Sequence, residues 1–327
     1  MLGFMLMSFP LFRSSNAIGI MCAVGASVCF STTDVTIKFL SDAYALHQIV
    51  LLRSSIGIVV ILMILMAGTG GLQNLKTKRL TRHLVRGGCV VMANMLFFLG
   101  LAAMPLADAV ALFFISPSII TLFSIIFLKE YVGPHRWFAI GLGFVGVLIM
   151  VQPGSSEFIL ASLLPIGAAF CYAGLHTLTR TMRDTESAST MTFYIQVAFV
   201  IVSTIMWIGV GDGRFNDESS PSLNFLLRPW GPWQYDDFKL FILLGMASTL
   251  GGYLISQAYR HAEAALAAPF EYIALPLAML FGLVVFDEWP NTITLIGSGF
   301  ILASGLYTLY RETRHPHKPQ MARPHQR

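Results

Sequence analysis

Charge is scarce in this sequence. Only 12% of its residues are charged, whereas 55% are apolar. A soluble domain with so few charged side chains could not cover its own surface. The sequence also lacks a GxxxxGK[ST] phosphate-binding loop and the HExxH and GxSxG motifs. These absences argue against ATP hydrolysis by the usual route and against membrane protease or esterase activity. The charge is also too sparse for a nucleic-acid-binding surface.

Cysteine is rare as well, and the sequence offers no metal-binding or redox motif. No CxxC pair or His/Cys cluster occurs, so we predict no metal, no cofactor and no disulfide framework. The four cysteines fall within long apolar runs, where they are expected to act as small packing residues. They are Cys22, Cys29, Cys89 and Cys171.

Long apolar runs are what the sequence has in abundance. Each run has about 17 to 23 residues, enough for a helix to cross a hydrocarbon layer of ~30 Å. We therefore predict an all-α membrane protein with ten transmembrane helices. The predicted spans are 17–40, 46–67, 86–103, 107–128, 136–152, 158–178, 190–211, 239–260, 264–286 and 292–310.

The distribution of Lys and Arg predicts how these spans are oriented. With the N-terminus inside, sixteen of the 21 cations fall on the cytoplasmic side. Lys38 and Arg53 lie within spans, and only Arg214, Arg228 and Lys239 fall on the opposite side. This bias follows the positive-inside rule, so both termini are expected in the cytoplasm. Arg13 and the apolar stretch after it resemble a signal peptide, but without a convincing cleavage site we expect an uncleaved first span.

The sequence contains an internal repeat, with two similar copies of one segment. Each copy would hold five spans, and an odd number inverts the second copy relative to the first, as in many alternating-access transporters. We assign an N-terminal segment to 1–16, the repeats to 17–152 and 158–310, and a polar cytoplasmic tail to 311–327. The long loop at 211–238 is expected to be solvated and mildly acidic. The matching segments are 25–38 with 167–180, 103–109 with 258–264, and 141–144 with 297–300.

The repeats and their motifs resemble the drug/metabolite transporter superfamily, and more narrowly its EamA-domain branch. The resemblance rests on Ala-[Asp/Glu]-Ala at the start of spans four and nine, on Glu130 and Glu288 at their ends, and on the segment 267–272. It implies two inverted five-helix repeats in a bacterial inner membrane. It also implies transport of a small metabolite, such as an amino acid, S-adenosylmethionine, riboflavin or another amphiphile.

An ionisable side chain in the middle of a membrane helix costs about 2.5–3.5 kcal/mol, so each one needs a reason. Asp34 and Lys38 are four residues apart, hence on one helical face and able to pair. Their repeat equivalents are His176 and Arg180. We expect Asp34 and His176 to contact substrate or to take part in a proton-linked step. Lys38 is expected near the outer end of its span, as a gating or ion-pairing residue.

Glu271 is the sharpest candidate for a substrate-binding residue. It follows Pro269, whose missing N–H favours a kink, and its counterpart in the first repeat is Ser116, beside Pro117. Kinked helices that carry polar groups mark substrate sites in transporters built from inverted repeats. Arg53 is the expected buried partner of Glu271. Whether the two touch substrate or only pair with each other stays open at this point.

Further residues could complete such a site. Phe30 and Tyr172 are repeat equivalents that could stack on a planar ring, and Asn94, Gln257 and Tyr272 are polar groups at plausible depth. The glycines at 141, 143, 146, 297 and 299 would let spans five and ten pack closely against a neighbour, within the bundle or in a homodimer.

The leading interpretation is a secondary transporter of the inner membrane that moves a small organic metabolite by alternating access. Riboflavin or S-adenosylmethionine uptake is favoured, and amino-acid or metabolite export is the alternative. A membrane-embedded enzyme acting on lipid head groups is less consistent with the scattered single charges. Expected partners are the small-molecule substrate and membrane lipid.

Overall fold

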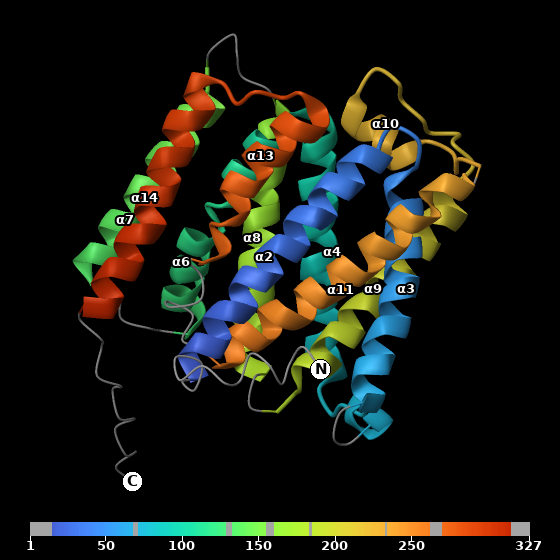
Figure 1. Ribbon diagram of the computed structural model, residues 1–327, viewed down its shortest axis with the longest axis horizontal. Helices are drawn as coiled ribbons and strands as arrows, with labels where there is room; N and C mark the ends of the chain where they lie inside the picture. Colours follow the sequence, from blue (N-terminus) through green and yellow to red (C-terminus); the bar gives the residue numbers. More distant parts are fainter. Residues whose placement is uncertain are drawn as a thin grey trace.

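Every regular element that the structure describes is helical (Figure 1). The computed structural model describes residues 15–67, 71–128, 133–154, 160–182, 185–232, 234–261 and 270–314. Helices are the expected solution in lipid, because they pair the backbone N–H and C=O groups within one segment. The helices are α2 (Ser15–Leu40), α3 (Leu46–Ala67), α4 (Leu80–Ala103), α5 (Leu106–Phe113), α6 (Ser116–Leu128), α7 (Pro134–Val151), α8 (Leu163–Met182), α9 (Ala188–Val210), α10 (Pro221–Leu227), α11 (Phe238–His261), α13 (Ala274–Phe286) and α14 (Thr292–Arg314).

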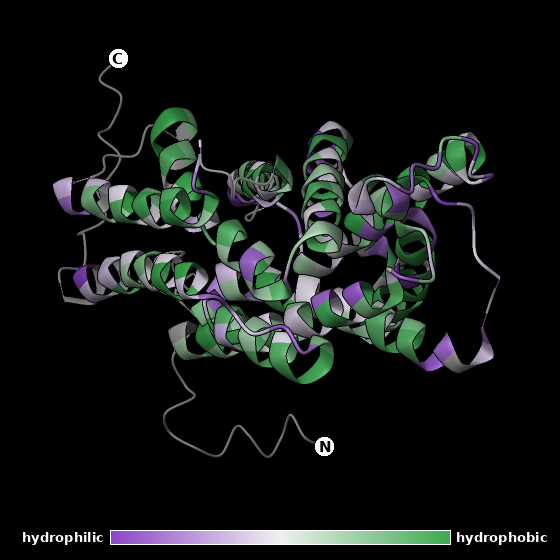
Figure 2. Cartoon of the chain, turned by 90° about the horizontal axis from the view of Figure 1, so that it is seen from above, coloured by the Kyte–Doolittle hydropathy of each residue, from purple (hydrophilic) through white to green (hydrophobic). Residues whose placement is uncertain are grey.

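Most of these helices are apolar enough for a membrane. Within the described ranges, seven stretches are also long enough to cross one, among them Leu106–Phe127, which runs through α5 and α6, and three further apolar helices are shorter. Figure 2 shows hydrophobic residues along most of the helical ribbon. Several helices differ from their predicted spans. α4 begins at Leu80 instead of 86, α8 ends at Met182 instead of 178, and the predicted span 107–128 is divided into α5 and α6.

The two predicted repeats are interleaved, not merely adjacent. α2 of the first repeat packs most extensively against α11 of the second, and α4 of the first packs against α8 of the second. α3 lies against α9, and α7 lies against α14 at one edge of the molecule (Figure 1). The packing is therefore reciprocal, as a pseudo-two-fold relation between the halves requires.

Two helices break at corresponding places near the centre. The first break falls at Phe114 and Ile115, between α5 and α6, and the second at Tyr272 and Ile273, just before α13. The rings of Phe114 and Tyr272 meet with centroids 5.1 Å apart. The two breaks therefore contact each other in the middle of the bundle.

The position of the breaks corrects the predicted repeat equivalence. Ser116 begins the helix that follows the first break, and Ala274 begins the helix that follows the second. Glu271 lies one residue before its break, so its structural counterpart is Phe113 and not Ser116. Pro269 and Glu130 lie outside the described residues.

Each break is followed at once by a proline in the first turn of the next helix. Pro117 occupies this place in α6, and Pro276 occupies it in α13. A proline is tolerated in the first turn because its missing N–H has no partner there anyway. Sequence analysis identified Pro117 but overlooked Pro276.

The segment at 211–238 is more ordered than a solvated loop. It contains α10, which starts with Ser220 as N-cap and Pro221 at its first position and buries Phe225 to 1% exposure. Ser222 Oγ donates a hydrogen bond of 2.6 Å to the Leu99 carbonyl. Gln48 exchanges two hydrogen bonds of 3.1 Å with the backbone of Gly231. The segment is thus a folded cap on the ends of α3 and α4.

The predicted glycine motif divides into packed and unpacked positions. A Cβ on Gly146 would lie 2.7 Å from the Gly297 carbonyl oxygen, whereas Cβ atoms on Gly141 and Gly299 would meet nothing within 4 Å. Close approach at Gly146 and Gly297 therefore sets the crossing of α7 and α14. The predicted homodimer stays a prediction.

Gly146→Ala is expected to destabilise the α7–α14 pair, because overpacking typically costs about 1–3 kcal/mol. Gly141→Ala is the matched control, since its new methyl group points into open space. Thermal unfolding of the detergent-solubilised chain compares the two variants. Equal melting temperatures would contradict the close crossing of these helices.

Candidate functional site

A central cavity lies among α2, α3, α4, α8, α9 and α11, and the segments before both helix breaks complete it. The empty space measures about 1310 Å³, which includes solvent at its opening. A concave space lined by apolar and aromatic side chains with a few polar groups is typical of a site for a small organic molecule. Both predicted repeats contribute to its lining. Seven of the predicted site residues line it, namely Phe30, Asp34, Arg53, Asn94, Tyr172, His176 and Glu271.

Arg53 forms one pole of the cavity. Arg53 is only 3% exposed, and its Nη2 donates a 2.7 Å hydrogen bond to Asn94 Oδ1. The guanidinium lies over the rings of Phe199 at 4.8 Å and Phe98 at 5.6 Å, so two cation–π contacts hold its plane. The Nε–H is buried and has no hydrogen-bond partner. Arg53 therefore keeps a donor that no residue in the described part of the chain uses.

Asp34 on α2 is the acid that interacts with this pole. Its carboxylate interacts electrostatically with Arg53, although the two groups are not within ion-pairing distance. The predicted Asp34–Lys38 pair is not formed. Lys38 points instead to Glu288, with Nζ 2.6 Å from Oε1, and also donates to the Met104 carbonyl at 3.1 Å.

Glu271 is the centre of a second polar cluster in the lining, which we call the second pole. Its Oε1 accepts a hydrogen bond from the Tyr259 hydroxyl, and its Oε2 accepts one of 3.4 Å from Tyr172. The ring of His176 lies between the two tyrosines, with centroids 4.2 Å from Tyr172 and 5.0 Å from Tyr259. The His176 Nε2 is buried without a partner. The predicted Arg53–Glu271 pair is absent, since each residue bonds to other groups.

Sequence analysis missed several polar groups of the lining. Arg86 was counted as a cytoplasmic cation, but it is 3% exposed and donates to Thr179 Oγ1 at 2.8 Å and to the Met191 carbonyl at 2.9 Å. Gln196 on α9 donates to Thr249 Oγ1 at 2.8 Å. A predicted third span that began at Leu80, as α4 does, would have placed Arg86 inside the membrane helix. No pattern marks a single Gln in an apolar helix as facing the interior.

Four predicted site residues lie outside the cavity lining. Tyr272 is buried against Phe114, Gln257 donates to the Tyr253 hydroxyl at 2.9 Å, and Ser116 is buried at the start of α6. Lys38 lies beyond the cavity, at the end of α2. Glu288 also accepts a 2.9 Å hydrogen bond from the Leu106 N–H, so this ion pair ties together three segments of the chain.

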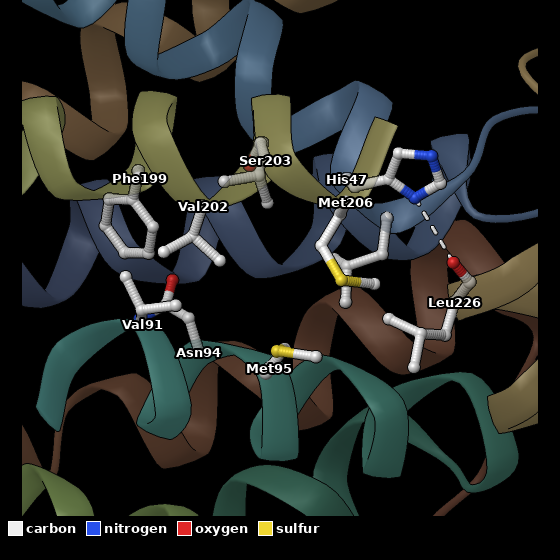
Figure 3. Close-up of a pocket in the computed structure, with 11 residues that line it drawn as sticks. His47, Val91, Asn94, Met95, Phe199, Val202, Ser203, Met206 and Leu226 are labelled. Carbon is white, nitrogen blue, oxygen red and sulfur yellow. Dashed lines mark hydrogen bonds between the residues drawn. The ribbon is translucent and has the colours of Figure 1, made fainter. Parts of the chain in front are cut away.

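A smaller pocket of about 350 Å³ empty volume lies beside the cavity, beneath α10 (Figure 3). Asn94 and Phe199 line both spaces and so form the wall between them. His47 reaches the Leu226 carbonyl of α10 through Nδ1 at 3.2 Å, the dashed line in Figure 3. The rest of the lining is mainly aliphatic and thioether side chains.

This architecture matches a known family twice along the chain. The family model described as the EamA-like transporter family matches residues 17–152 and again residues 159–310. The chain belongs to the EamA-like transporter family. The family match confirms the resemblance seen in the sequence, and members of this family are membrane transporters.

Several bacterial relatives of known name match nearly the whole chain. A riboflavin transporter of Vibrio cholerae is 30% identical, over 90% of this chain and 94% of its own length. An S-adenosylmethionine uptake transporter of Rickettsia bellii is 25% identical, over 91% and 95%. A pseudopaline exporter of Pseudomonas aeruginosa is 27% identical, over 88% and 94%. A solved crystal structure shares the fold, with a TM-score of 0.65 and 16% identity over 91% of this chain and 99% of its own.

The hydrogen bonds that Tyr259 and Tyr172 donate to Glu271 should differ in strength. The Tyr259 hydroxyl donates directly to Oε1, whereas the bond from Tyr172 is 3.4 Å long, at the limit for a hydrogen bond. A hydrogen bond to a charged group contributes about 1.5–3 kcal/mol, and a poor geometry contributes much less. Double-mutant cycles of Tyr259→Phe and Tyr172→Phe, each with Glu271→Gln, measure both couplings by unfolding. We expect a coupling of at least about 1 kcal/mol for Tyr259 and a smaller one for Tyr172. The reverse order would contradict this arrangement.

Proposed function

We propose that the chain takes up riboflavin, or a similarly planar metabolite, by alternating access as a secondary transporter of the bacterial inner membrane. Ten spans in two inverted repeats would place both termini in the cytoplasm. The observation that carries the proposal is the two-pole cavity lined with aromatic rings and built from both repeats. The name of the Vibrio cholerae relative supports the substrate.

The poles suggest how such a substrate would be held. Arg53 and Asn94 would bind carbonyl oxygens at the edge of a ring, because Arg53 has an unused Nε–H. Phe30 and Tyr172 would contact the ring faces, as offset and edge-on aromatic packing favours. Hydroxyl groups of a side chain would find partners at Asp34 and His176, which also line the cavity. We do not assign Tyr272, Gln257 or Ser116 to the substrate.

Two other functions have specific support. S-Adenosylmethionine is the substrate in the name of one relative, and a cation could approach Asp34 or Glu271. Export is the direction in the name of another relative. A membrane-embedded enzyme has less support, since the relatives are named as transporters.

Counterflow in proteoliposomes tests the substrate directly. The purified chain, loaded with unlabelled riboflavin inside the vesicles, should accumulate labelled riboflavin from outside. Parallel vesicles receive S-adenosylmethionine or an amino-acid mixture. Absence of riboflavin counterflow, with counterflow of one of the others, would overturn riboflavin in favour of that compound.

Arg53→Lys is expected to lower riboflavin counterflow about tenfold, because a lysine cannot replace the planar donor fork. Tenfold corresponds to the loss of about one charge-assisted hydrogen bond. Arg214→Lys is the control, since Arg214 is exposed and pairs only loosely with Asp212 at 3.6 Å. Equal transport by both variants would remove Arg53 from the binding site.

The Lys38–Glu288 pair is expected to hold the outer side closed. Lys38→Met would release α2 from the connector after α13, and one partly exposed ion pair of up to ~1 kcal/mol shifts a population about fivefold. The measurement is labelling of Thr33→Cys by an impermeant maleimide, added outside to a background without native cysteines. Labelling should accelerate several-fold in Lys38→Met but not in Arg214→Met. An unchanged rate would exclude this gating role.

A further inference from the structure

The geometry points to Glu271 as the proton-binding group of the transport cycle, held by Tyr172 and Tyr259 and moving its proton inward together with the solute. This inference rests on the proposed function and adds its coupling ion. It also replaces the sequence-based hypothesis that placed a proton-linked step at Asp34 and His176.

Among the residues that the structure describes, the groups that contact Glu271 are hydrogen-bond donors and carry no positive charge. Its carboxylate accepts from two phenol hydroxyls, of Tyr259 on α11 and Tyr172 on α8. From α2, the Ser27 hydroxyl faces the Glu271 backbone carbonyl at 3.4 Å. No described Lys or Arg lies within ion-pairing distance of the carboxylate, and the sequence 262–269 contains neither residue.

Asp34 differs from Glu271 in this respect. Arg53 acts on Asp34 electrostatically, so a cation partly offsets the negative charge of Asp34. Glu271 has no such cation among the described residues. Desolvating an uncompensated charge is expensive in a membrane interior, and a bound proton cancels the charge without a counter-ion. A proton is therefore the ligand that this carboxylate is suited to carry.

His176 and Arg86 complete the titratable and charged groups on this side of the cavity. His176 packs between the tyrosines, and Arg86 acts on it electrostatically. The Arg86 guanidinium itself bonds to Thr179 and to the Met191 carbonyl. It is thus committed to neighbouring helices and does not reach Glu271.

The proton step is a simple association. A proton from water on the outer side binds a Glu271 carboxylate oxygen and yields a neutral carboxyl group. The Tyr259 hydroxyl, which donates to the carboxylate, then turns to accept the new O–H. After reorientation the proton returns to water on the cytoplasmic side. The bound proton cancels the charge of the carboxylate and lowers the cost of reorienting the carrier that holds the solute. After proton and solute have left, the Tyr259 and Tyr172 hydroxyls again hold the carboxylate, and the empty carrier returns. Proton and solute therefore move in the same direction.

The position of Glu271 connects this step with movement of the protein. It lies one residue before the break at Tyr272, and Tyr272 packs on Phe114 at the other break. A change of charge at Glu271 therefore acts at the place where the two broken helices touch. Hinge motions are absorbed by a few loop or element-terminal residues, and both breaks are such positions.

Glu271→Gln separates proton coupling from substrate binding, because Gln imitates the protonated acid. Proteoliposomes with the purified chain are tested for labelled riboflavin uptake with and without an inward proton gradient, and for counterflow without a gradient. We expect the gradient to stimulate uptake at least fivefold in the wild type and not at all in Glu271→Gln. Counterflow by Glu271→Gln should remain within about threefold of wild type.

Two controls and one direct measurement accompany this test. Glu218→Gln makes the same chemical change on an exposed residue and should keep the full gradient response. Asp34→Asn should lower counterflow but keep the stimulation ratio. In weakly buffered detergent solution, riboflavin addition should change the pH measurably with the wild type and not with Glu271→Gln.

The outcomes distinguish the two proposals. Loss of counterflow in a Glu271→Gln variant with a wild-type melting temperature would make Glu271 a substrate ligand and overturn the inference. Wild-type counterflow without any gradient response would also overturn it and leave the proposed function intact. A wild type without riboflavin counterflow would overturn both.

Discussion

Arg53 is buried in the apolar interior of the bundle, and its environment shows how this protein keeps charge inside lipid. Two phenyl rings and one amide contact the guanidinium, and Asp34 acts on it electrostatically without forming an ion pair. Charge buried without full compensation is costly, and such residues mark functional sites in membrane proteins. Charged side chains inside the membrane need polar partners that lipid cannot supply, and the cavity lining provides them. The same requirement explains why Glu271 is surrounded by hydroxyl groups.

The broken helices follow from the same requirement. A continuous apolar helix would present no free backbone groups and no change of direction at mid-depth. The breaks at Phe114 and Tyr272, each followed by a proline, end one helix and start another beside the cavity. Irregular backbone is tolerated at membrane depth only where protein or water covers it. Here each break is covered by the other, through the contact of their two rings.

Much of the site could be predicted from the sequence because of the repeat. Phe30 and Asp34 were paired with Tyr172 and His176 by spacing alone, and all four side chains line one cavity. Glu271 was found because an acid in an apolar run is rare. These signals depend on composition and periodicity, which survive without coordinates.

Other features could not be predicted, for identifiable reasons. Partners across helices depend on tertiary packing, so the sequence suggested Arg53–Glu271 where the structure has Arg53–Asn94 and Glu271–Tyr259. Neutral polar groups such as Gln196 carry no charge to make them conspicuous. The cap at 211–238 was expected to be solvated because its composition is polar, yet its hydrogen bonds go to the ends of α3 and α4.

The two poles belong to different repeats. Arg53 and Asn94 are contributed by the first, and Tyr172, Tyr259 and Glu271 by the second. A solute that contacts both poles at once therefore bridges the two halves, and it binds most tightly when the halves are close. Since a ligand shifts an equilibrium only by its differential affinity for the two states, such a solute would favour the closed, loaded carrier. An empty carrier has only its own packing to hold it, and this includes the Lys38–Glu288 pair on one side. In the proposed cycle, neutralising Glu271 would lower the electrostatic cost of that closure, which is why solute and proton would be required together.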